Sequence, residues 1–306
     1  MMSNQDRIDY SRNDPILVAL GGNALQGGHH FRHFPALAAA CKTLVESSPR
    51  PMIITHGNGP QIGQLALDTR QNSYPGLDVL GAEIEGLLGY LIEQELSNFS
   101  DSEKIISILT RVEVSADDPM LAKPTKLIGP WLREDQAKRL SRAFNWTFKH
   151  RNGKYKRIVA SPKPQRILQV DAIRELLGSG YIVICAGGGG IPVVRDATGF
   201  MQGVDAVIDK DLSSSLLAQQ LNARTLIFVT DVEGVYRDWN TNNQRLLSRA
   251  SPTELEDMAL EAGSMGPKAQ AACHFVHATG NNARIGALKD LGNLLKGQSG
   301  TLIQYP

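Results

Sequence analysis

The amino-acid sequence predicts an α/β fold in which a mostly parallel sheet lies between layers of helices. Short apolar runs alternate with amphipathic segments almost from end to end of the chain. The apolar runs lack a clean alternation of apolar and polar residues, which is typical of strands covered on both faces. With 306 residues the chain can bury a large core, in one large domain or two small ones.

The elements follow in order along the chain. Six short apolar runs are predicted to be strands: Ile16–Leu20, Pro51–Thr55, Ile105–Leu109, Tyr181–Gly187, Thr225–Thr230 and Thr301–Tyr305. Seven segments with apolar residues at helical spacing are predicted to be helices: Ala36–Val45, Gln61–Asp68, Leu80–Leu96, Val170–Leu177, Leu212–Leu221, Pro252–Ala262 and Lys268–Ala278.

Residues 117–164 break this rhythm. A helix is expected near Leu132–Phe144, and aromatic and β-branched residues on both sides of Asn152-Gly153 predict a β-hairpin. The proline-containing segments that flank this stretch are stiff and do not resemble flexible linkers. We therefore expect one domain over residues 15–306, a subdomain protruding from it at about 117–164, and a polar tail at 1–14.

Composition favours an ordinary globular protein. The chain is 42% hydrophobic and 21% charged, with a formal net charge of +1, so no nucleic-acid or membrane partner is expected. Cys41, Cys185 and Cys273 are odd in number and far apart, which favours a reducing cytoplasm. No stretch of the sequence approaches the roughly 18 uninterrupted apolar residues of a membrane span.

Glycine-rich turns follow three of the predicted strands. They are GGN at residues 21–23, HGNGP at His56–Pro60 and GGGGIP at Gly187–Pro192. The carboxyl ends of parallel strands meet at one edge of a sheet, where ligands of open α/β sheets bind. Glycines let backbone N–H groups approach an anion, and a helix beginning at Pro60 would add its positive end. The turns therefore predict an anion site, although any one of them could be merely a tight turn.

Familiar phosphate motifs are absent from the sequence. The first turn does not match G-x-G-x-x-G, and no ribose-binding acid is convincingly placed after it. The P-loop pattern, the H-R-D and D-F-G elements of protein kinases and the serine-hydrolase pattern G-x-S-x-G do not occur.

Three lysines lie among turn formers and small residues, away from charged helix faces. They are Lys126 in KPTKLIGP, Lys210 in AVIDKDLSSS and Lys268 in GSMGPK. Phosphoryl transfer needs cations around the moving group and a fixed in-line geometry, which three lysines, glycine turns and Mg²⁺ would supply. Asp209 and Asp211 flank Lys210 and could orient the ammonium groups or hold the metal through water. The alternative for any single lysine is a solvated surface charge.

Two histidine groups are poorer candidates for a site. His29, His30 and His33 lie in a polar loop, where the remaining ligands of a metal are not evident and exposure to solvent is expected. Cys273, His274 and His277 lie in one predicted helix, but the motif H-E-x-x-H is not present.

Seven motifs occur in a characteristic order: ALGGNAL, THGNGPQIG, PTKLIGP, ASPKP, GGGGIPV, AVIDKD and GSMGPK. This set resembles the carbamate kinases of the amino-acid-kinase superfamily, over about residues 17–302. GLDVL at Gly76–Leu80 and the segment GKYKRIVASPKP are most similar to the carbamate kinases associated with allantoin and oxalurate breakdown. The resemblance implies a three-layer αβα sandwich with a helix-plus-hairpin lid, usually a homodimer, that makes ATP from carbamoyl phosphate and Mg-ADP.

The resemblance also implies roles for single residues. Lys126 would reach over the transferring phosphoryl group, Lys210 and Lys268 would flank it, and Asp211 would position those two lysines. Carbamoyl phosphate or its phosphoryl group would be cradled by Gly21, Gly22, Asn23, Gly57, Asn58, Gly188 and Gly189. The nucleotide would be bound by Thr230, Asp231, Val235, Tyr236 and Met265. No strong base is needed because the carbamate oxygen is already anionic, and no direct protein ligand to the metal is expected.

Three features depart from the family pattern. Glu85 stands where most relatives have glutamine, the hairpin tip KHRNGKYKR replaces an acidic–Gly–Arg–Gly pattern, and the connection after Leu25 is short and rich in histidine. An extra carboxylate near an anion site would repel the substrate unless it is protonated or turned away.

Two other functions stay open from the residues alone. One is a sister kinase acting on an acylated amino acid or a related carboxylate, which a roomier pocket with an arginine for the α-carboxylate would favour. The other is a catalytically silent paralogue that binds nucleotide or carbamoyl phosphate. Glu85 and the altered hairpin favour the silent paralogue, whereas the intact Lys126, Lys210 and Lys268 argue against it.

Overall fold

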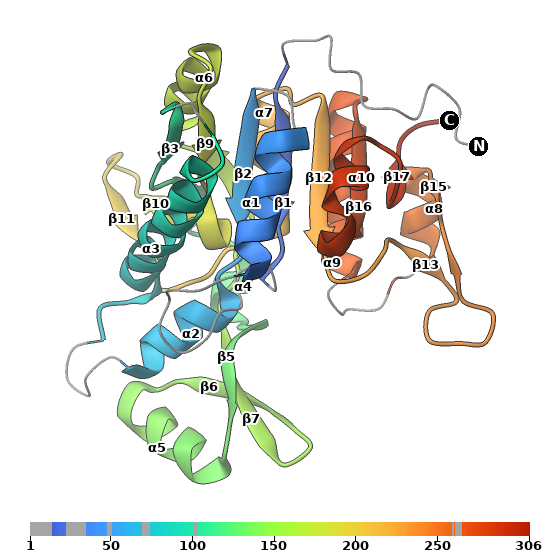
Figure 1. The fold of residues 1–306 in the computed structure, drawn as a ribbon. Helices are drawn as coiled ribbons and strands as arrows, with labels where there is room; N and C mark the ends of the chain where they lie inside the picture. The colour runs from blue at the N-terminus through green and yellow to red at the C-terminus, as the bar shows by residue number, and fades with distance from the viewer. Residues whose placement is uncertain are drawn as a thin grey trace.

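The computed structural model describes residues 14–22, 35–47, 51–68, 74–100, 103–258, 260 and 265–306. The predicted fold class is confirmed, because one large, mostly parallel sheet lies between two layers of helices (Figure 1). Asn23, the histidines at positions 29, 30 and 33, the altered connection after Leu25 and all but the last residue of the expected tail lie outside the described residues. In the described ranges, no helix combines the length and the apolar character that spanning a bilayer requires.

The large sheet has eight strands. In spatial order they are β15 (Arg249–Ala250), β17 (Thr301–Ile303), β16 (Asn282–Ala287), β12 (Thr225–Thr230), β1 (Ile16–Leu20), β2 (Met52–His56), β9 (Ile182–Ile184) and β3 (Ile105–Ser107). The strands from β16 to β3 are parallel, and β17 is antiparallel to β16. Strand β16 was not predicted, because NARIGA carries an arginine and a glycine and does not read as an apolar run.

Two cores flank the sheet, which explains the missing alternation in the strands. In β1, Ile16, Val18 and Leu20 face one core, while Leu17 and Ala19 face the other. The first core is covered by α1 (Pro35–Ser47), α2 (Gly59–Asp68), α3 (Leu77–Ser97) and α10 (Leu291–Leu295). The second is covered by α6 (Val170–Gly178), α7 (Lys210–Gln220), α8 (Pro252–Asp257) and α9 (Met265–Thr279). Helix α8 ends earlier than the predicted Ala262, although residues 259 and 261–264 are not described.

Smaller elements complete the body of the molecule. A second sheet has the order β11 (Met201–Gly203), β10 (Ile191–Arg195), β4 (Arg111–Val114) and β8 (Pro164–Ile167). A short ribbon pairs β13 (Tyr236–Arg237) with β14 (Arg245–Leu246). Three short helices, α4 (Pro119–Ala122), η3 (Gly187–Gly189) and η4 (Leu288–Asp290), lie in connections.

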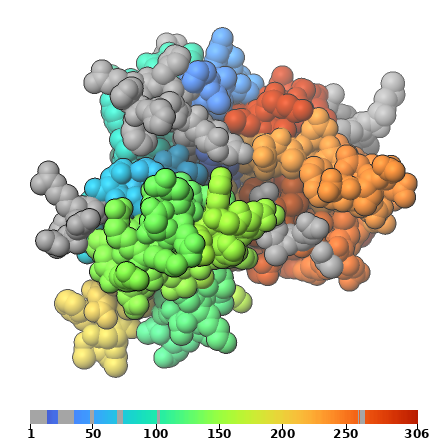
Figure 2. All heavy atoms as spheres, turned by 90° about the horizontal axis from the view of Figure 1, so that it is seen from below, coloured from blue at the N-terminus to red at the C-terminus, as the bar shows by residue number. Residues whose placement is uncertain are grey.

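The expected helix and hairpin project from the carboxyl edge of the large sheet (Figure 1). This lid consists of β5 (Lys126–Leu132), α5 (Glu134–Phe144), β6 (Thr147–Arg151) and β7 (Lys154–Val159), with strand order β5-β7-β6. The hairpin turns at Asn152 and Gly153, whose φ values of 50° and 71° suit the tight two-residue turn that the sequence predicts. Viewed from below, the lid lies between α2 and the segment around residues 230–250 (Figure 2).

Candidate active site

The glycine turns predicted to bind an anion lie in contact with one another at the carboxyl edge of the sheet. A Cβ atom on Gly57 would lie 3.3 Å from the backbone nitrogen of Gly22, and one on Gly21 would lie 2.7 Å from the carbonyl oxygen of Val229. A Cβ on Gly188 would lie 1.9 Å from the side-chain nitrogen of Asn58. A larger residue at Gly188 would therefore push the second and third turns apart, and one at Gly21 would push the first turn away from β12.

The third turn is the most strained of the glycine turns. Ala186, Gly188, Gly189 and Gly190 have φ values of 50°, 67°, 102° and 82°, which favour glycine at the last three positions. The hydroxyl of Ser213 on α7 donates a 2.7 Å hydrogen bond to the carbonyl oxygen of Gly189. This bond ties the turn to the helix that carries Lys210.

Helix α7 begins at the same edge of the sheet. The side chain of Asp209 caps it, with Oδ1 accepting hydrogen bonds from the backbone nitrogens of Asp211 at 2.9 Å and Leu212 at 3.4 Å. The cap sets the first helical residue, Lys210, beside the second glycine turn: its Cδ would be 3.6 Å from a Cβ on Gly57. The helix start and its lysine therefore face the same space as the turns.

The three predicted lysines come together through two aspartates, and we call these five residues the lysine cluster. Lys126 Nζ lies 2.7 Å from Asp209 Oδ2, Lys210 Nζ lies 2.7 Å from Asp211 Oδ1, and Lys268 Nζ lies 3.2 Å from Asp211 Oδ2. The lysines come from the lid, α7 and α9, which are far apart in the sequence. The cluster carries three positive and two negative groups, so it favours an anion.

Desolvation shapes the electrostatics of the lysine cluster. The side chains of Lys210 and Lys268 are 13% and 10% exposed. Burial, helped by the charge of Lys268, lowers the pKa of Lys210, although Asp211 opposes the shift. Burial disfavours the ionised form of Asp209, but Lys126 and the capping N–H of Asp211 outweigh it, and the pKa of Asp209 is below its ordinary value. A phosphate that binds at the lysine cluster would meet a net positive charge that water screens poorly, so its attraction to the lysines would be strong.

From the sequence, Asp209 could orient the ammonium groups or hold a metal through water, and the structure adds a further role as the N-cap of α7. Asp209 caps the helix and pairs with the lid lysine at the same time. The cap could have been predicted, because an aspartate directly before a helix start is a common N-cap. Its second bond joins residues 83 positions apart and depends on the lid's placement.

The lid is attached to the body at a second place. Arg157 of the lid donates a 3.0 Å hydrogen bond to the hydroxyl of Tyr74, which donates a 2.7 Å bond to Asp205. The Arg157 guanidinium lies 3.6 Å from the ring centroid of Trp146, within the lid, and 5.3 Å from that of Tyr74. Leu77 at the start of α3 also donates to Asp205, at 2.8 Å. We call Arg157, Tyr74 and Asp205 the lid latch.

The residues predicted to bind nucleotide continue from the glycine turns along one side. Thr230 ends β12, and its Cα would lie 3.7 Å from a Cβ on Gly21. The Thr230 hydroxyl donates a 3.0 Å hydrogen bond to the exposed Asp231. Met265 is the first residue of α9, whose first turn also carries Lys268. Both ends of this predicted set thus adjoin the turns or the lysine cluster.

Val235 and Tyr236 lie further along the same segment. Val235 is fully buried, and its backbone nitrogen donates a 2.8 Å hydrogen bond to Thr301 Oγ1. The Tyr236 hydroxyl donates a 3.1 Å bond to Glu233, and its ring lies 5.1 Å from that of Trp239, which sequence reasoning did not single out. The backbone of this segment is therefore fixed, while its aromatic side chains stay accessible.

Two buried titratable residues, His56 and Glu85, lie behind the third turn and were not assigned site roles. A Cβ on Gly187 would lie 2.3 Å from His56 Nε2 and 3.0 Å from Glu85 Cγ. Burial lowers the pKa of His56 to about 4, so its ring is neutral near pH 7. Burial raises the pKa of Glu85 to about 8. The Glu85 carboxyl therefore lies against the turn, and at pH 7 its raised pKa favours the protonated form.

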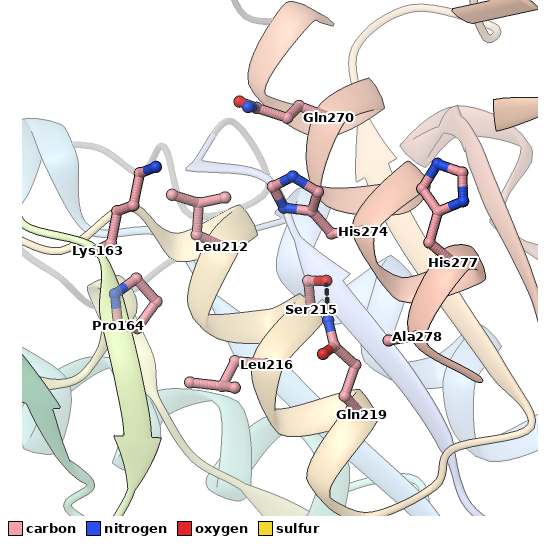
Figure 3. Close-up of a pocket in the computed structure, with 10 residues that line it drawn as sticks. All are labelled: Lys163, Pro164, Leu212, Ser215, Leu216, Gln219, Gln270, His274, His277 and Ala278. Atoms are coloured by element: carbon pink, nitrogen blue, oxygen red, sulfur yellow. Dashed lines mark hydrogen bonds between the residues drawn. The ribbon is translucent and has the colours of Figure 1, made fainter. Parts of the chain in front are cut away.

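A separate groove of about 490 Å³ runs between α7 and α9 (Figure 3). His274 and His277 line it with Leu212, Leu216 and Lys163, and none of the cluster lysines does. His277 bonds to Tyr305 at 2.7 Å and to Glu256 at 3.0 Å, so both of its ring nitrogens are engaged. Within the described ranges, no group of three His, Cys, Asp or Glu side chains is arranged to hold a metal.

The comparisons with known proteins agree with this geometry. The sequence profile of the amino acid kinase family matches residues 14–287. A carbamate kinase from Haemophilus influenzae is 45% identical over 303 residues, covering 94% of this chain and 96% of the relative. One from Rhizobium meliloti is 43% identical over 300 residues, covering 94% and 92%. The chain therefore belongs to the amino acid kinase family. Within that family, the relatives that it matches here are carbamate kinases.

Solved structures give the same result. A carbamate kinase from Giardia lamblia bound to citric acid has a TM-score of 0.85 at 31% identity, covering 95% of this chain and 98% of that one. An N-acetylglutamate synthase from Neisseria gonorrhoeae has a TM-score of 0.59 at 15% identity, which shows a shared fold alone.

Proposed function

We propose that this chain is an active carbamate kinase, which transfers a phosphoryl group reversibly between carbamoyl phosphate and ADP to give ATP and carbamate. The observation that carries the proposal is the lysine cluster, whose Lys210 abuts the glycine turns in a chain 45% identical to a curated carbamate kinase. This arrangement offers cations and backbone N–H donors to one small anion.

Each part of the site has a proposed task in this reaction. Lys210 and Lys268, bridged by the carboxylate of Asp211, would neutralise the phosphoryl oxygens as charge shifts between donor and acceptor. Lys126 would reach the same group from the lid once the anion competes with Asp209 for its ammonium. The turns at Gly21, Gly22, Gly57, Asn58, Gly188 and Gly189, together with Asn23, would hold the carbamoyl phosphate. The carbamate oxygen that attacks ATP in the reverse direction is already anionic, so no base is required.

We propose that the nucleotide binds along Thr230, Asp231, Val235, Tyr236 and Met265. A carbamate kinase from Giardia lamblia bound to AMP-PNP, with a TM-score of 0.81 to this chain, supports an adenine nucleotide as the ligand. Mg²⁺ commonly binds one or two carboxylates together with water and substrate phosphates, and Asp209 and Asp211 fit such a role through water. When bound, the metal would neutralise charge on the nucleotide phosphates.

A coupled assay tests the proposed function. ATP formation from ADP and Mg²⁺ is measured with carbamoyl phosphate, acetyl phosphate and phosphorylated N-acetyl amino acids as donors. We expect turnover with carbamoyl phosphate to exceed that with the others by at least an order of magnitude. Turnover only with an acylated amino-acid phosphate would establish the sister kinase instead. Nucleotide binding by calorimetry with no turnover on any donor would establish the silent paralogue.

We also propose that two copies of the chain associate through the outer face of α3. Val79, Leu87 and Tyr90 are exposed on this face, Tyr90 to 58%, and the exposed Leu109 packs next to Gly86 of the same helix. Strand β3, next to this patch in the sequence, is a terminal strand of the large sheet. Sedimentation should give a dimer for the wild type and a monomer for Tyr90→Glu. A wild-type monomer at micromolar concentration would overturn the proposal.

We propose a cytoplasmic location and membership of the variety associated with allantoin and oxalurate breakdown. Three free cysteines, all buried, support a reducing compartment. The segments GLDVL and GKYKRIVASPKP support the narrower assignment. Deleting the gene in its host should slow growth on allantoin as the nitrogen source, and unchanged growth would refute the assignment.

A further inference from the structure

The carboxyl group of Glu85 supports the back of the third glycine turn. Its Oε1 accepts a 2.9 Å hydrogen bond from the backbone nitrogen of Gly187, and its Oε2 accepts a 3.4 Å bond from that of Thr110. The side chain is 1% exposed and lies on α3, which contacts the turn directly. Gly187 adjoins Gly188, one of the residues proposed to hold carbamoyl phosphate, so Glu85 supports the turn that carries this residue.

Thr110 connects the Glu85 carboxyl to the start of the turn. Thr110 Oγ1 donates its proton to the carbonyl oxygen of Ile108 at 2.9 Å and accepts a 2.9 Å bond from the backbone nitrogen of Ala186. Hydrogen bonds from Gly187 and Thr110 favour the ionised carboxyl, but the burial of the group outweighs them. The neutral acid still accepts from both backbone N–H groups and places no charge in this buried site.

The surroundings give a negative charge on Glu85 little compensation. In the described ranges Glu85 forms no ion pair within 4.0 Å. His56 of β2 packs against the same glycine but is neutral near pH 7, and Cys185, which precedes the turn, is a buried thiol whose pKa is raised. Lys210 lies beyond His56, where its charge disfavours a proton on the ring. Burial accordingly raises the pKa of Glu85 to about 8.

We propose that Glu85 is a positioning residue that works as a neutral carboxylic acid. While protonated, it holds the turn from Ala186 to Gly190 in its strained shape and adds no negative charge behind the proposed phosphoryl site. When it ionises, a buried negative charge without a cationic partner is added next to the turn that is proposed to hold the anion. The inference rests on the proposed function for its effect on catalysis, whereas the protonation state of Glu85 can be measured without it.

The pH profile of catalysis tests the role in positioning. We compare kcat/KM for carbamoyl phosphate between pH 6 and 9.5 in the wild type, Glu85→Gln and Glu83→Gln, an exposed glutamate on the same helix. The amide of Glu85→Gln donates and accepts as the neutral acid does, so activity at pH 6.5 should stay within about threefold of the wild type. The wild type and Glu83→Gln should lose activity above about pH 8. Glu85→Gln should keep its activity there, and an identical alkaline decline in all three proteins would overturn the proposal.

Infrared titration tests the protonation state without any assay of activity. The wild-type spectrum minus that of Glu85→Gln should contain the carbonyl stretch of a protonated carboxyl at pH 6.5, and the band should vanish above about pH 8. If Glu85→Gln does not fold, the wild-type titration alone gives the same reading, because ordinary carboxyls are ionised at pH 6.5. A missing band with normal turnover would refute this inference and leave the proposed function intact. If the band is present but the protein shows no turnover on any donor, the proposed function is refuted and this inference stays intact.

Discussion

The lysine cluster and the third glycine turn lie at the same edge of the sheet but are stabilised in opposite ways. In the cluster every charge has a partner, since Asp211 pairs with Lys210 and Lys268, and Asp209 pairs with Lys126. Behind the turn, Glu85 is the buried acid and the nearby His56 is neutral. The turn keeps its shape through backbone hydrogen bonds and close packing, since a Cβ atom added at Gly188 would lie only 1.9 Å from the side-chain nitrogen of Asn58.

This difference follows from what each region must offer an anion. Lysines can be desolvated only when carboxylates compensate their charge, and a phosphate can take over part of that compensation when it binds. Backbone N–H groups are neutral, so they bind an anion only when the turn points them at it. A nearby negative charge would weaken their attraction for that anion. The two regions should therefore respond differently to substitution: the cluster through charge, the turn through shape.

Removing a lysine from the cluster should have the largest effect. Lys210→Ala and Lys268→Ala should each lower kcat by at least ~10²-fold, because each removes one electrostatic stabiliser of the transferring group. Steady-state kinetics with carbamoyl phosphate and ADP measures the loss. Lys42→Ala, which removes an exposed lysine of α1, is the matched control and should leave kcat unchanged. Equal rates in correctly folded Lys210→Ala would refute the assigned role.

Altering the shape of the turn should have an intermediate effect. Gly188 has a φ of 67°, and its Cβ would overlap the amide of Asn58. Gly188→Ala should therefore lower kcat/KM roughly tenfold, since backbone strain of this kind costs about 1 to 3 kcal/mol and 1.4 kcal/mol is a factor of ten. Gly178→Ala, with nothing within 4 Å of the new atom, is the control. An equal, small effect in both variants would show that the shape of the turn does not matter.

Much of the fold could be predicted from the sequence because its strands are buried on both faces. Ile16–Leu20 and Thr225–Thr230 match their predicted bounds, since continuous apolar runs end at glycine or acidic turns. Strand β16 was missed because a central strand there contains Arg284, which is 1% exposed and bonds to the carbonyl of Ser299. The small second sheet was missed because its strands, such as RVEV and MQG, are short and mixed in character.

Some features of the site could be predicted from neighbouring residues in the sequence, whereas others depend on contacts between distant residues. Lys210 and the glycines could be recognised from the residues next to them in the sequence, and the structure brings them together as expected. The partners of Lys126 and Glu85 lie 83 and 102 positions away, and no local pattern encodes those distances. For the same reason, the sequence could state that Glu85 must be protonated or turned away but could not choose between them. In the structure the carboxyl is buried against the turn, and burial raises its pKa to about 8, which favours the protonated form near pH 7.

Loosening the lid latch should have the smallest effect. This change leaves the charge of Lys126 in place and alters only how firmly the lid positions it. Tyr74→Phe removes the hydroxyl that accepts from Arg157 and donates to Asp205, while Lys126 and its bond to Asp209 stay in place. The free energy of unfolding should fall by about 1 kcal/mol, the usual net value of such a hydrogen bond. Because the lid carries Lys126, KM for carbamoyl phosphate should rise about threefold while kcat changes less, since binding must now restrict a looser lid. Urea unfolding and steady-state kinetics measure both, with Tyr155→Phe, on the same hairpin and packed on His150, as the control. A fall in stability without any rise in KM would mean that the latch holds the fold together but does not place Lys126.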